Sequence, residues 1–101
     1  MVVTVSDHTA IELIAAERER QITGERWTIS HDDSHGAGQL ALAAAVYAIP
    51  PKKRGDRVLG MLWPWSDRWY KPTPDDRIRE LVKAGALIVA EIDRIQRIGA
   101  S

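Results

Sequence analysis

Apolar residues recur at intervals of three and four over the last quarter of the chain, and this pattern constrains the fold most. They are Ile78, Leu81, Val82, Gly85, Ile88, Val89, Ile92 and Ile95. This spacing places them on one face of an α-helix. Pro74 and Asp75 suit a first helical turn, and Gly99 suits a helix end. The pattern therefore predicts a long amphipathic helix from about residue 74 to 97.

An alanine-rich segment, QLALAAAVYA, predicts a second helix. It begins between Ser34 and Gly38 and stops at Ile49, because two prolines follow and cannot continue a helix. Its small side chains allow neighbouring backbones to approach closely, so we expect this to be the central helix. Gly85 costs about 1 kcal/mol in a helix interior, which predicts that the alanine-rich helix crosses the third helix there.

A third periodic segment near the start predicts a helix from Thr9 to about Ile22, capped by Ser6 or Asp7. Its apolar positions are Ile11, Ile14, Ala15 and Ile22. Glu17 and Gln21 lie beside this apolar stripe, where half-buried polar groups need partners. Residues 1–8 are expected to form a flexible tail.

Residues 50–74 are longer than an ordinary loop and contain three of the four tryptophans, in WPWSDRW. Connections of this length are usually functional, disordered or fixed by their own side chains. The indoles favour the last of these. The expected fold is an all-α, compact three-helix domain over residues 9–98, with a short helix within 56–70 as an alternative.

Composition excludes several classes of protein. The 101 residues suffice for one domain, and 14 basic and 14 acidic residues give no net charge. The basic run PPKKRGDR is therefore expected to be a solvated loop, and we expect no specific nucleic-acid partner. No segment has the apolar length of a membrane span, so no membrane partner is expected. The chain has no cysteine, which fits a cytoplasmic protein.

The segment HDDSHG concentrates polar groups before the second helix. Its residues His31, Asp32, Asp33 and His35 could hold a metal or a polar ligand. Asp and Ser at this position also suit a helix N-terminus, where they accept backbone hydrogen bonds. Capping and a ligand pocket both remain open, and no metal or other cofactor is favoured; any metal would fall on these four residues.

We expect the polar face of the first helix to meet HDDSHG, because only a short turn separates them. The aromatic segment LWPWSDRWYKP could then cover the pocket or stack on a ring. The candidate ligand-binding residues are Glu17, Arg20, Gln21, Trp27, His31, Asp32, Asp33, His35, Trp65, Trp69, Tyr70 and Lys71. Trp63 belongs to the same expected aromatic lid.

Several of these motifs together resemble a family of small proteins carried by bacteriophages and prophages. The resemblance rests on AERERQ, on WTISHDDSH and the alanine-rich run to residue 48, on WPWSDRWYKP and on LVKAGALIVAEIDRI. It covers about residues 11–97 and implies a phage or prophage context. Gln39 is a departure, since the resemblance implies Glu at that position in many relatives.

A weaker similarity is to all-helical nucleotide pyrophosphohydrolases of the MazG type, which implies Mg²⁺ held by paired acids at helical spacing. The chain departs from that pattern. Ala15 follows Glu12 at the expected distance, Arg20 follows Glu17, and an arginine also follows Glu91. Magnesium-dependent hydrolysis is therefore the alternative reading.

The absence of a complete catalytic set favours a non-enzymatic protein. We expect a phage or prophage accessory protein that binds a small polar ligand, nucleotide-derived in the favoured case, or a host protein, and so interferes with a host process such as defence. A third class, a structural protein that forms homo-oligomers, would bury its Ala/Gly faces and Trp side chains between subunits.

Overall fold

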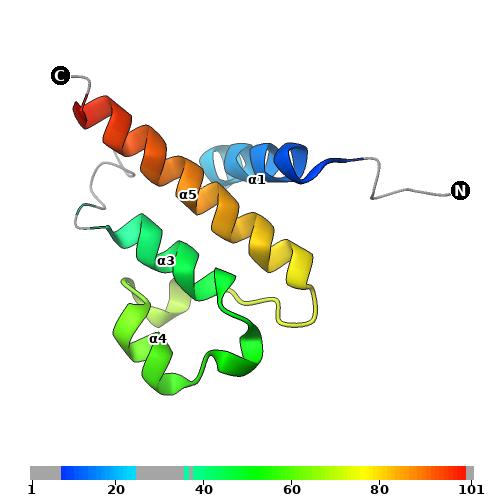
Figure 1. Cartoon of the computed structure of the whole chain (residues 1–101), viewed down its shortest axis with the longest axis vertical. Helices are drawn as coiled ribbons and strands as arrows, with labels where there is room; N and C mark the ends of the chain where they lie inside the picture. Colours follow the sequence, from blue (N-terminus) through cyan, green and yellow to red (C-terminus); the bar gives the residue numbers. More distant parts are fainter. Residues whose placement is uncertain (1–7, 25–35, 37, 100–101) are drawn as a thin grey trace, which may run out of the picture.

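The computed structural model describes residues 8–24, 36 and 38–99. Over these residues the chain forms helices and turns, with no strand (Figure 1). The elements are α1 (Ala10–Gly24), α3 (Gln39–Ala48), the 3-10 turn η2 (Pro51–Lys53), α4 (Asp56–Leu62), the 3-10 turn η3 (Asp67–Trp69) and α5 (Arg77–Gly99). The all-α class is confirmed, including the short helix within 56–70. Among the described helices, none is both long and apolar enough to cross a membrane.

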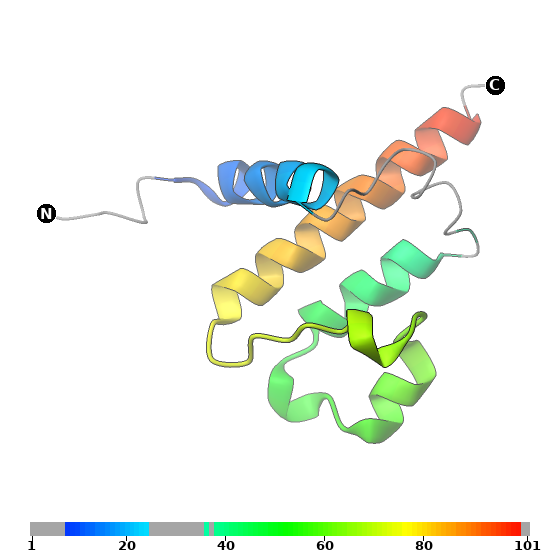
Figure 2. The same ribbon diagram turned by 180° about the vertical axis from the view of Figure 1, so that it is seen from behind.

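The centre of the fold is α5 and not the alanine-rich helix. α3 packs along α5, α1 crosses α5 on another side, and α4 packs against α3 (Figure 1 and Figure 2). The prediction that residues 39–48 form the central helix is therefore wrong. The 23-residue α5 contacts both α1 and α3, whereas the 10-residue α3 does not contact α1 to a comparable extent.

The core lies between α3 and α5 and is built from small and aliphatic side chains. Its buried members are Leu40, Ala43, Ala44, Tyr47, Ala84, Leu87 and Ala90. Alanines on both helices allow the two backbones to approach closely, and Leu40 and Leu87 fill the space between them. Trp63, Trp65 and Tyr70 pack against this core from the connection. The expectation that the aromatic residues fix the long connection is confirmed.

Gly85 marks the crossing of α5 with α1 and not with α3. A Cβ atom at this position would lie 2.6 Å from Cδ1 and 2.9 Å from Cγ1 of Ile14. The prediction of a close helix crossing at Gly85 is correct, but its partner is wrong. The glycine accommodates the bulk of Ile14, whereas the small side chains of α3 meet Ala84 and its neighbours.

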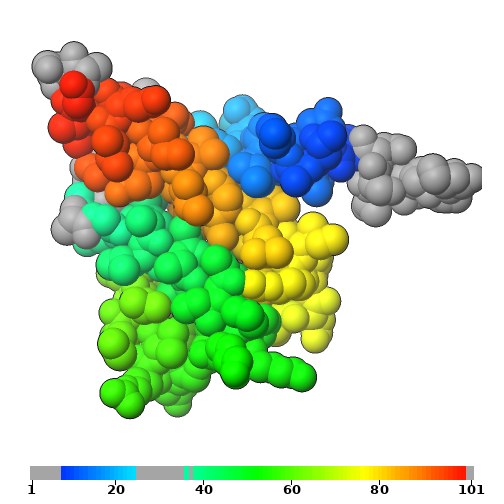
Figure 3. Space-filling view, viewed as in Figure 1, coloured from blue at the N-terminus to red at the C-terminus, as the bar shows by residue number. Residues whose placement is uncertain are grey.

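Most of the apolar stripe of α5 does not face the core. Ile78, Leu81, Ile88, Ile92 and Ile95 are exposed, and Val82 is the member that is buried. Figure 3 shows α5 on an outer face of the molecule. The buried face of α5 is instead formed by small residues and two carboxylates, Glu80 and Glu91. Alanine gives a weak hydrophobic signal, so the exposed isoleucines dominate the periodicity.

Helix α1 begins with a reciprocal cap. The Thr9 hydroxyl accepts a hydrogen bond from the Glu12 backbone N–H at 3.1 Å, and the Glu12 carboxylate accepts one from the Thr9 N–H at 2.8 Å. These hydrogen bonds lower the pKa of Glu12. Thr9 therefore caps this helix in place of the predicted Ser6 or Asp7, which lie outside the described residues.

The connection from α3 to α5 is held by charged groups as well as by aromatic rings. Arg77, the first residue of α5, donates to the carbonyl oxygens of Tyr47 at 2.9 Å and Ala48, and so occupies the C-terminal end of α3. The Asp76 carboxylate accepts a hydrogen bond from the Arg79 N–H at 3.0 Å and caps α5. Helix α5 thus begins three residues later than Pro74, the earliest start predicted.

Candidate functional site

A buried polar cluster lies where α1 crosses α5. Glu17 and Gln21, one turn apart on α1, are 2% and 3% exposed. The Glu17 carboxylate accepts two hydrogen bonds from Arg20, at 2.8 Å each, and pairs with Arg79 of α5 at 2.7 Å. Gln21 Nε2 donates to the same carboxylate at 3.3 Å. The sequence predicted that these groups lie half-buried beside an apolar stripe. They are instead the buried face of α1 themselves, and Ile11 of the predicted stripe is 79% exposed.

The cluster carries more positive than negative charge. Burial alone would raise the pKa of Glu17, but the hydrogen bonds from Arg20 and the charge of Arg79 outweigh it and lower the pKa. Burial lowers the pKa of Lys83, and the nearby charge of Arg79 lowers it further. Arg20, Arg79 and Lys83 therefore surround one carboxylate. We call Glu17, Arg20, Gln21, Arg79 and Lys83 the polar cluster.

Among the described residues, one oxygen in the polar cluster lacks a hydrogen-bond partner. It is Gln21 Oε1, which is buried. A buried acceptor without a donor costs about 1–3 kcal/mol. This oxygen therefore lowers the stability of the α1–α5 crossing.

Five of the predicted ligand-binding residues cannot be placed. Trp27, His31, Asp32, Asp33 and His35 lie outside the described residues. Whether HDDSHG is a cap, a ligand pocket or a metal site therefore stays a prediction, as does its meeting with α1.

Two buried glutamates stand at positions where the magnesium-binding pattern would begin, and each is paired with an arginine. Glu17 is paired with Arg20, and Glu91 accepts hydrogen bonds from Arg94 at 2.7 and 3.3 Å. In both places the arginine stands three residues after the glutamate, where the pyrophosphohydrolase pattern requires a second acid. Within the described ranges, no three His, Asp or Glu side chains gather as a metal site would require.

Lys83 links the polar cluster to the aromatic residues on the other side of α5. Its ammonium group lies 5.5 Å from the ring centroid of Tyr47 and donates to the Lys71 carbonyl oxygen at 2.7 Å. The Lys71 N–H in turn donates to the Tyr47 hydroxyl at 2.9 Å. The polar cluster and the aromatic residues, which the sequence predicted to form one pocket and its lid, thus lie on opposite sides of Lys83.

The aromatic residues of the connection stack against one another and against α3. The Trp63 ring lies 5.7 Å from Tyr47, 5.4 Å from Trp65 and 5.1 Å from Tyr70, centroid to centroid. The Trp65 indole N–H donates to Gln39 Oε1 at 3.1 Å, so Gln39 anchors the connection at the start of α3. A glutamate there, which the phage-protein resemblance implies, could accept the same hydrogen bond. Trp65, a predicted ligand-binding residue, therefore has a structural role in fixing the connection to α3.

Trp69 differs from the other three aromatic residues of the connection. It is 46% exposed, and the Arg68 guanidinium lies 5.2 Å from its ring centroid. This contact occupies a face of the indole with the chain's own cation.

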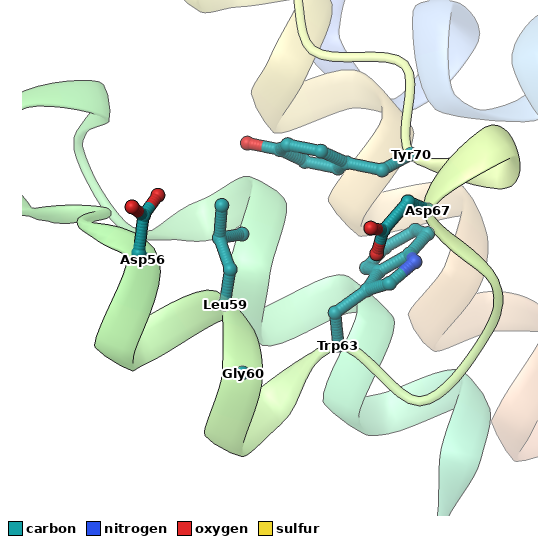
Figure 4. Close-up of a pocket in the computed structure, with 6 residues that line it drawn as sticks. All are labelled: Asp56, Leu59, Gly60, Trp63, Asp67 and Tyr70. Carbon is teal, nitrogen blue, oxygen red and sulfur yellow. The ribbon is translucent and has the colours of Figure 1, made fainter.

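A cleft opens between Tyr70 and helix α4, and we call it the aromatic cleft. Its volume is about 530 Å³, and it is lined by Asp56, Leu59, Gly60, Trp63, Asp67 and Tyr70. Figure 4 shows the Tyr70 ring across from Leu59, with Trp63 and Asp67 together at one end and Asp56 at the other. The Tyr70 and Trp63 ring planes are inclined by 56°. Tyr70 is the predicted ligand-binding residue that lines the cleft.

A buried ion pair holds the Tyr70 side of this cleft. The Arg54 guanidinium donates to the Tyr70 hydroxyl at 3.0 Å and to the Glu80 carboxylate at 2.6 Å. Glu80 also accepts from the Thr73 N–H at 3.0 Å, which ties the end of the connection to α5. Burial would raise the pKa of Glu80, but the hydrogen bonds from Arg54 and Thr73 outweigh it and lower the pKa.

The sequence patterns do not assign Arg54, Asp56, Asp67 or Glu80 to a site. Arg54 belongs to the basic run that predicts a solvated loop. Asp56 and Asp67 line one cleft only because the chain reverses between α4 and η3, and no local pattern signals that reversal. A usable signal was the proximity of both acids to the tryptophan-rich segment.

The fold and these sites define a small all-α protein with a core between α3 and α5 and an aromatic connection. Comparison with protein-family models finds no match, and neither do searches of curated proteins and of solved structures.

Proposed function

We propose that this is a non-enzymatic binding protein, and that the aromatic cleft takes an arginine or lysine side chain of a partner protein. The observation that carries the proposal is the lining of the cleft. Two carboxylates stand at its ends, two aromatic rings and Leu59 form its walls, and its lining includes no basic side chain.

The chemistry of the lining matches a long cationic side chain. A guanidinium or ammonium group gains about 0.5–2 kcal/mol over a Trp or Tyr ring, depending on how far it is desolvated. A neighbouring carboxylate such as Asp67 adds a charge-assisted hydrogen bond. The methylene stem of Arg or Lys would pack against Leu59 and the Tyr70 ring. The resemblance to phage-borne proteins favours a host protein as this partner.

Asp67→Asn should weaken binding of N-acetylarginine amide by about tenfold, which corresponds to about 1.4 kcal/mol. The reason is loss of the carboxylate beside the Trp63 ring. Binding is measured by NMR through the indole N–H signals, because only four tryptophans contribute. Asp75→Asn is the matched control, since Asp75 is equally exposed and lies outside the cleft.

Gly60→Leu tests the cleft by filling it. A Cβ atom at Gly60 would meet nothing within 4 Å, so the leucine can point into the cleft without disturbing the fold. We expect this variant to lose arginine binding while keeping its helix content. Equal shifts with N-acetylcitrulline amide, which has no charge, would contradict the proposal.

A second candidate function, nucleotide binding, is favoured by the polar cluster. A nucleotide carries a phosphate for Arg20 and Arg79, the part-exposed cations of the cluster. This ligand class agrees with the small polar ligand expected from the sequence. The cluster lies on α1 and α5, so it is separate from the aromatic cleft.

Arg79→Met should lower the affinity for ATP by about tenfold, the share of one charged contact to phosphate. Calorimetric titration without divalent metal measures this, and Arg57→Met serves as control because Arg57 is exposed and absent from the cluster. Equal affinities in both variants would count against the cluster. Phosphate or pyrophosphate release in the presence of Mg²⁺ would instead favour the hydrolase alternative.

A further inference from the structure

A long apolar face of α5 is exposed on either side of Gly85, where Ile14 of α1 packs. Its side chains Ile78, Leu81, Ile88, Ile92 and Ile95 are between 46% and 67% exposed. Gly85 lies within the same stripe, with Ile14 of α1 packed beside it. We call these six α5 positions the α5 stripe. Scattered apolar residues on a surface need no explanation, but a contiguous row of this length does.

The spacing of the α5 stripe is that of a coiled-coil seam. Its members follow one another at intervals of three, four, three, four and three residues. This repeat averages 3.5 residues, which keeps the same side chains facing a second helix over successive turns. The face of α5 that packs on α3 does not use these positions. The repeat is thus matched to a helix other than α3.

Charged side chains avoid the α5 stripe. At about 100° per residue, Arg79, Glu80, Lys83, Glu91, Asp93, Arg94 and Arg97 project from other faces of the helix. Arg77 stands at the edge of the stripe, but its guanidinium is directed to the carbonyl end of α3. Depletion of charge is characteristic of the centre of a protein interface.

We propose that the α5 stripe is a homodimer interface in which α5 pairs antiparallel with α5 of a second copy. In an antiparallel coiled coil the two kinds of seam position face each other. Ile78 then faces Ile95 of the second copy, Leu81 faces Ile92, and Gly85 faces Ile88. Every member of the stripe finds a partner, and the arrangement is two-fold symmetric, as a closed dimer requires.

The antiparallel arrangement is favoured over the parallel one. Ile14 of α1 packs on Gly85, so in a parallel pair the Ile14 side chains of both copies would meet at the same level of the seam and crowd it. In the antiparallel pair Ile14 of each copy lies opposite Ile88 of the other. Opposed helix dipoles also favour this direction.

The size of the stripe sets the strength of the dimer. It runs over the 18 residues from Ile78 to Ile95, which are about 26 Å apart along the helix axis. A strip of that length and one helix wide is smaller than the roughly 800 Å² per partner of a standard stable interface. We therefore expect a dimer that dissociates on dilution.

Sedimentation equilibrium from micromolar to millimolar concentration tests the interface. The unaltered protein should change from monomer to dimer, and Ile88→Glu should shift the dissociation constant at least tenfold. Ile98→Glu is the matched control, because Ile98 is an equally exposed isoleucine of α5 outside the stripe. A protein that stays monomeric at every concentration overturns the proposal, as does an equal effect of the two variants.

Disulfide trapping tests the direction of pairing, since the natural chain has no cysteine. Ile78→Cys and Ile95→Cys should not crosslink when each is oxidised alone, because each pair of identical positions lies about 26 Å apart. A mixture of the two variants should give the covalent heterodimer. Crosslinking of each variant alone indicates a parallel pair and overturns the antiparallel assignment, and no crosslink in the mixture also contradicts it.

Discussion

Arg54→Met is expected to destabilise the protein by about 3 kcal/mol, the lower end of the cost of breaking a buried ion pair. The Arg54 and Glu80 side chains are 2% and 0% exposed, so the variant leaves a buried carboxylate without its main partner. Arg77, 3.4 Å from the same carboxylate, and the Thr73 N–H retain part of the stabilisation. Chemical denaturation at neutral pH measures the loss.

The effect of Arg54→Met should depend on pH. The pKa of Glu80 is lowered in the folded protein from its ordinary value of 4.5, so the ion pair contributes stability above that pH and loses it as the pH falls through the folded pKa. Unaltered protein and variant should therefore converge in stability below about pH 4.5. Adding Glu80→Gln to Arg54→Met should recover much of the loss, because it removes the unpaired charge.

Arg57→Met is the control for this experiment, since Arg57 is an exposed arginine on the neighbouring helix. Surface substitutions of this kind change the free energy of unfolding by about 0.5 kcal/mol or less. An equal effect of the two arginine variants would show that the buried pair does not fix the connection.

Gly85→Leu is expected to displace α1 and to cost about 3 kcal/mol, the upper range for overpacking. Even a Cβ atom at this position would lie 2.6 Å from Ile14, and a leucine extends much further. The gain of about 1 kcal/mol from replacing a helical glycine does not offset this clash. Thermal or chemical unfolding measures the change.

Two further variants separate the clash from the intrinsic preference of glycine. Gly60→Leu makes the same substitution in α4, where the new side chain meets open space, and should be neutral or stabilising by up to about 1 kcal/mol. In an Ile14→Ala background, Gly85→Leu should cost much less than in the natural chain. If the cost is unchanged there, Ile14 is not what Gly85 accommodates.

The sequence was sufficient to predict the class of fold and the positions of the helices, because helix formers, prolines and caps act locally. It was misleading about which helix is central. The isoleucines at 78–95 give the strongest hydrophobic periodicity. The core of α5 is instead made of Ala84, Leu87 and Ala90, and alanine contributes little to such a periodic signal. Burial depends on what packs against a face, and periodicity alone does not contain that information.

In the candidate sites, too, local sequence patterns predict some residues, whereas others are revealed only by the fold. Glu17, Gln21 and Arg20 were identified because helical spacing places them on one face. Their partners Arg79 and Lys83 lie about 60 residues away in sequence, so only the crossing of α1 and α5 reveals them. The sequence does not predict the carboxylates of the aromatic cleft for a related reason, since only a chain reversal places Asp56 and Asp67 on the same cleft.

The placement of Gly85 and Ile14 has a consequence for how the molecule opens. Residues 39–90 are tied together by the α3–α5 core, the aromatic rings and two arginines that reach across elements, so they should unfold as one cooperative unit. Helix α1 is held chiefly by its single crossing of α5, and it can detach while that unit persists. Detachment would uncover Gly85 beside the isoleucines, so the hydrophobic area that α5 offers to another molecule depends on the local equilibrium of α1.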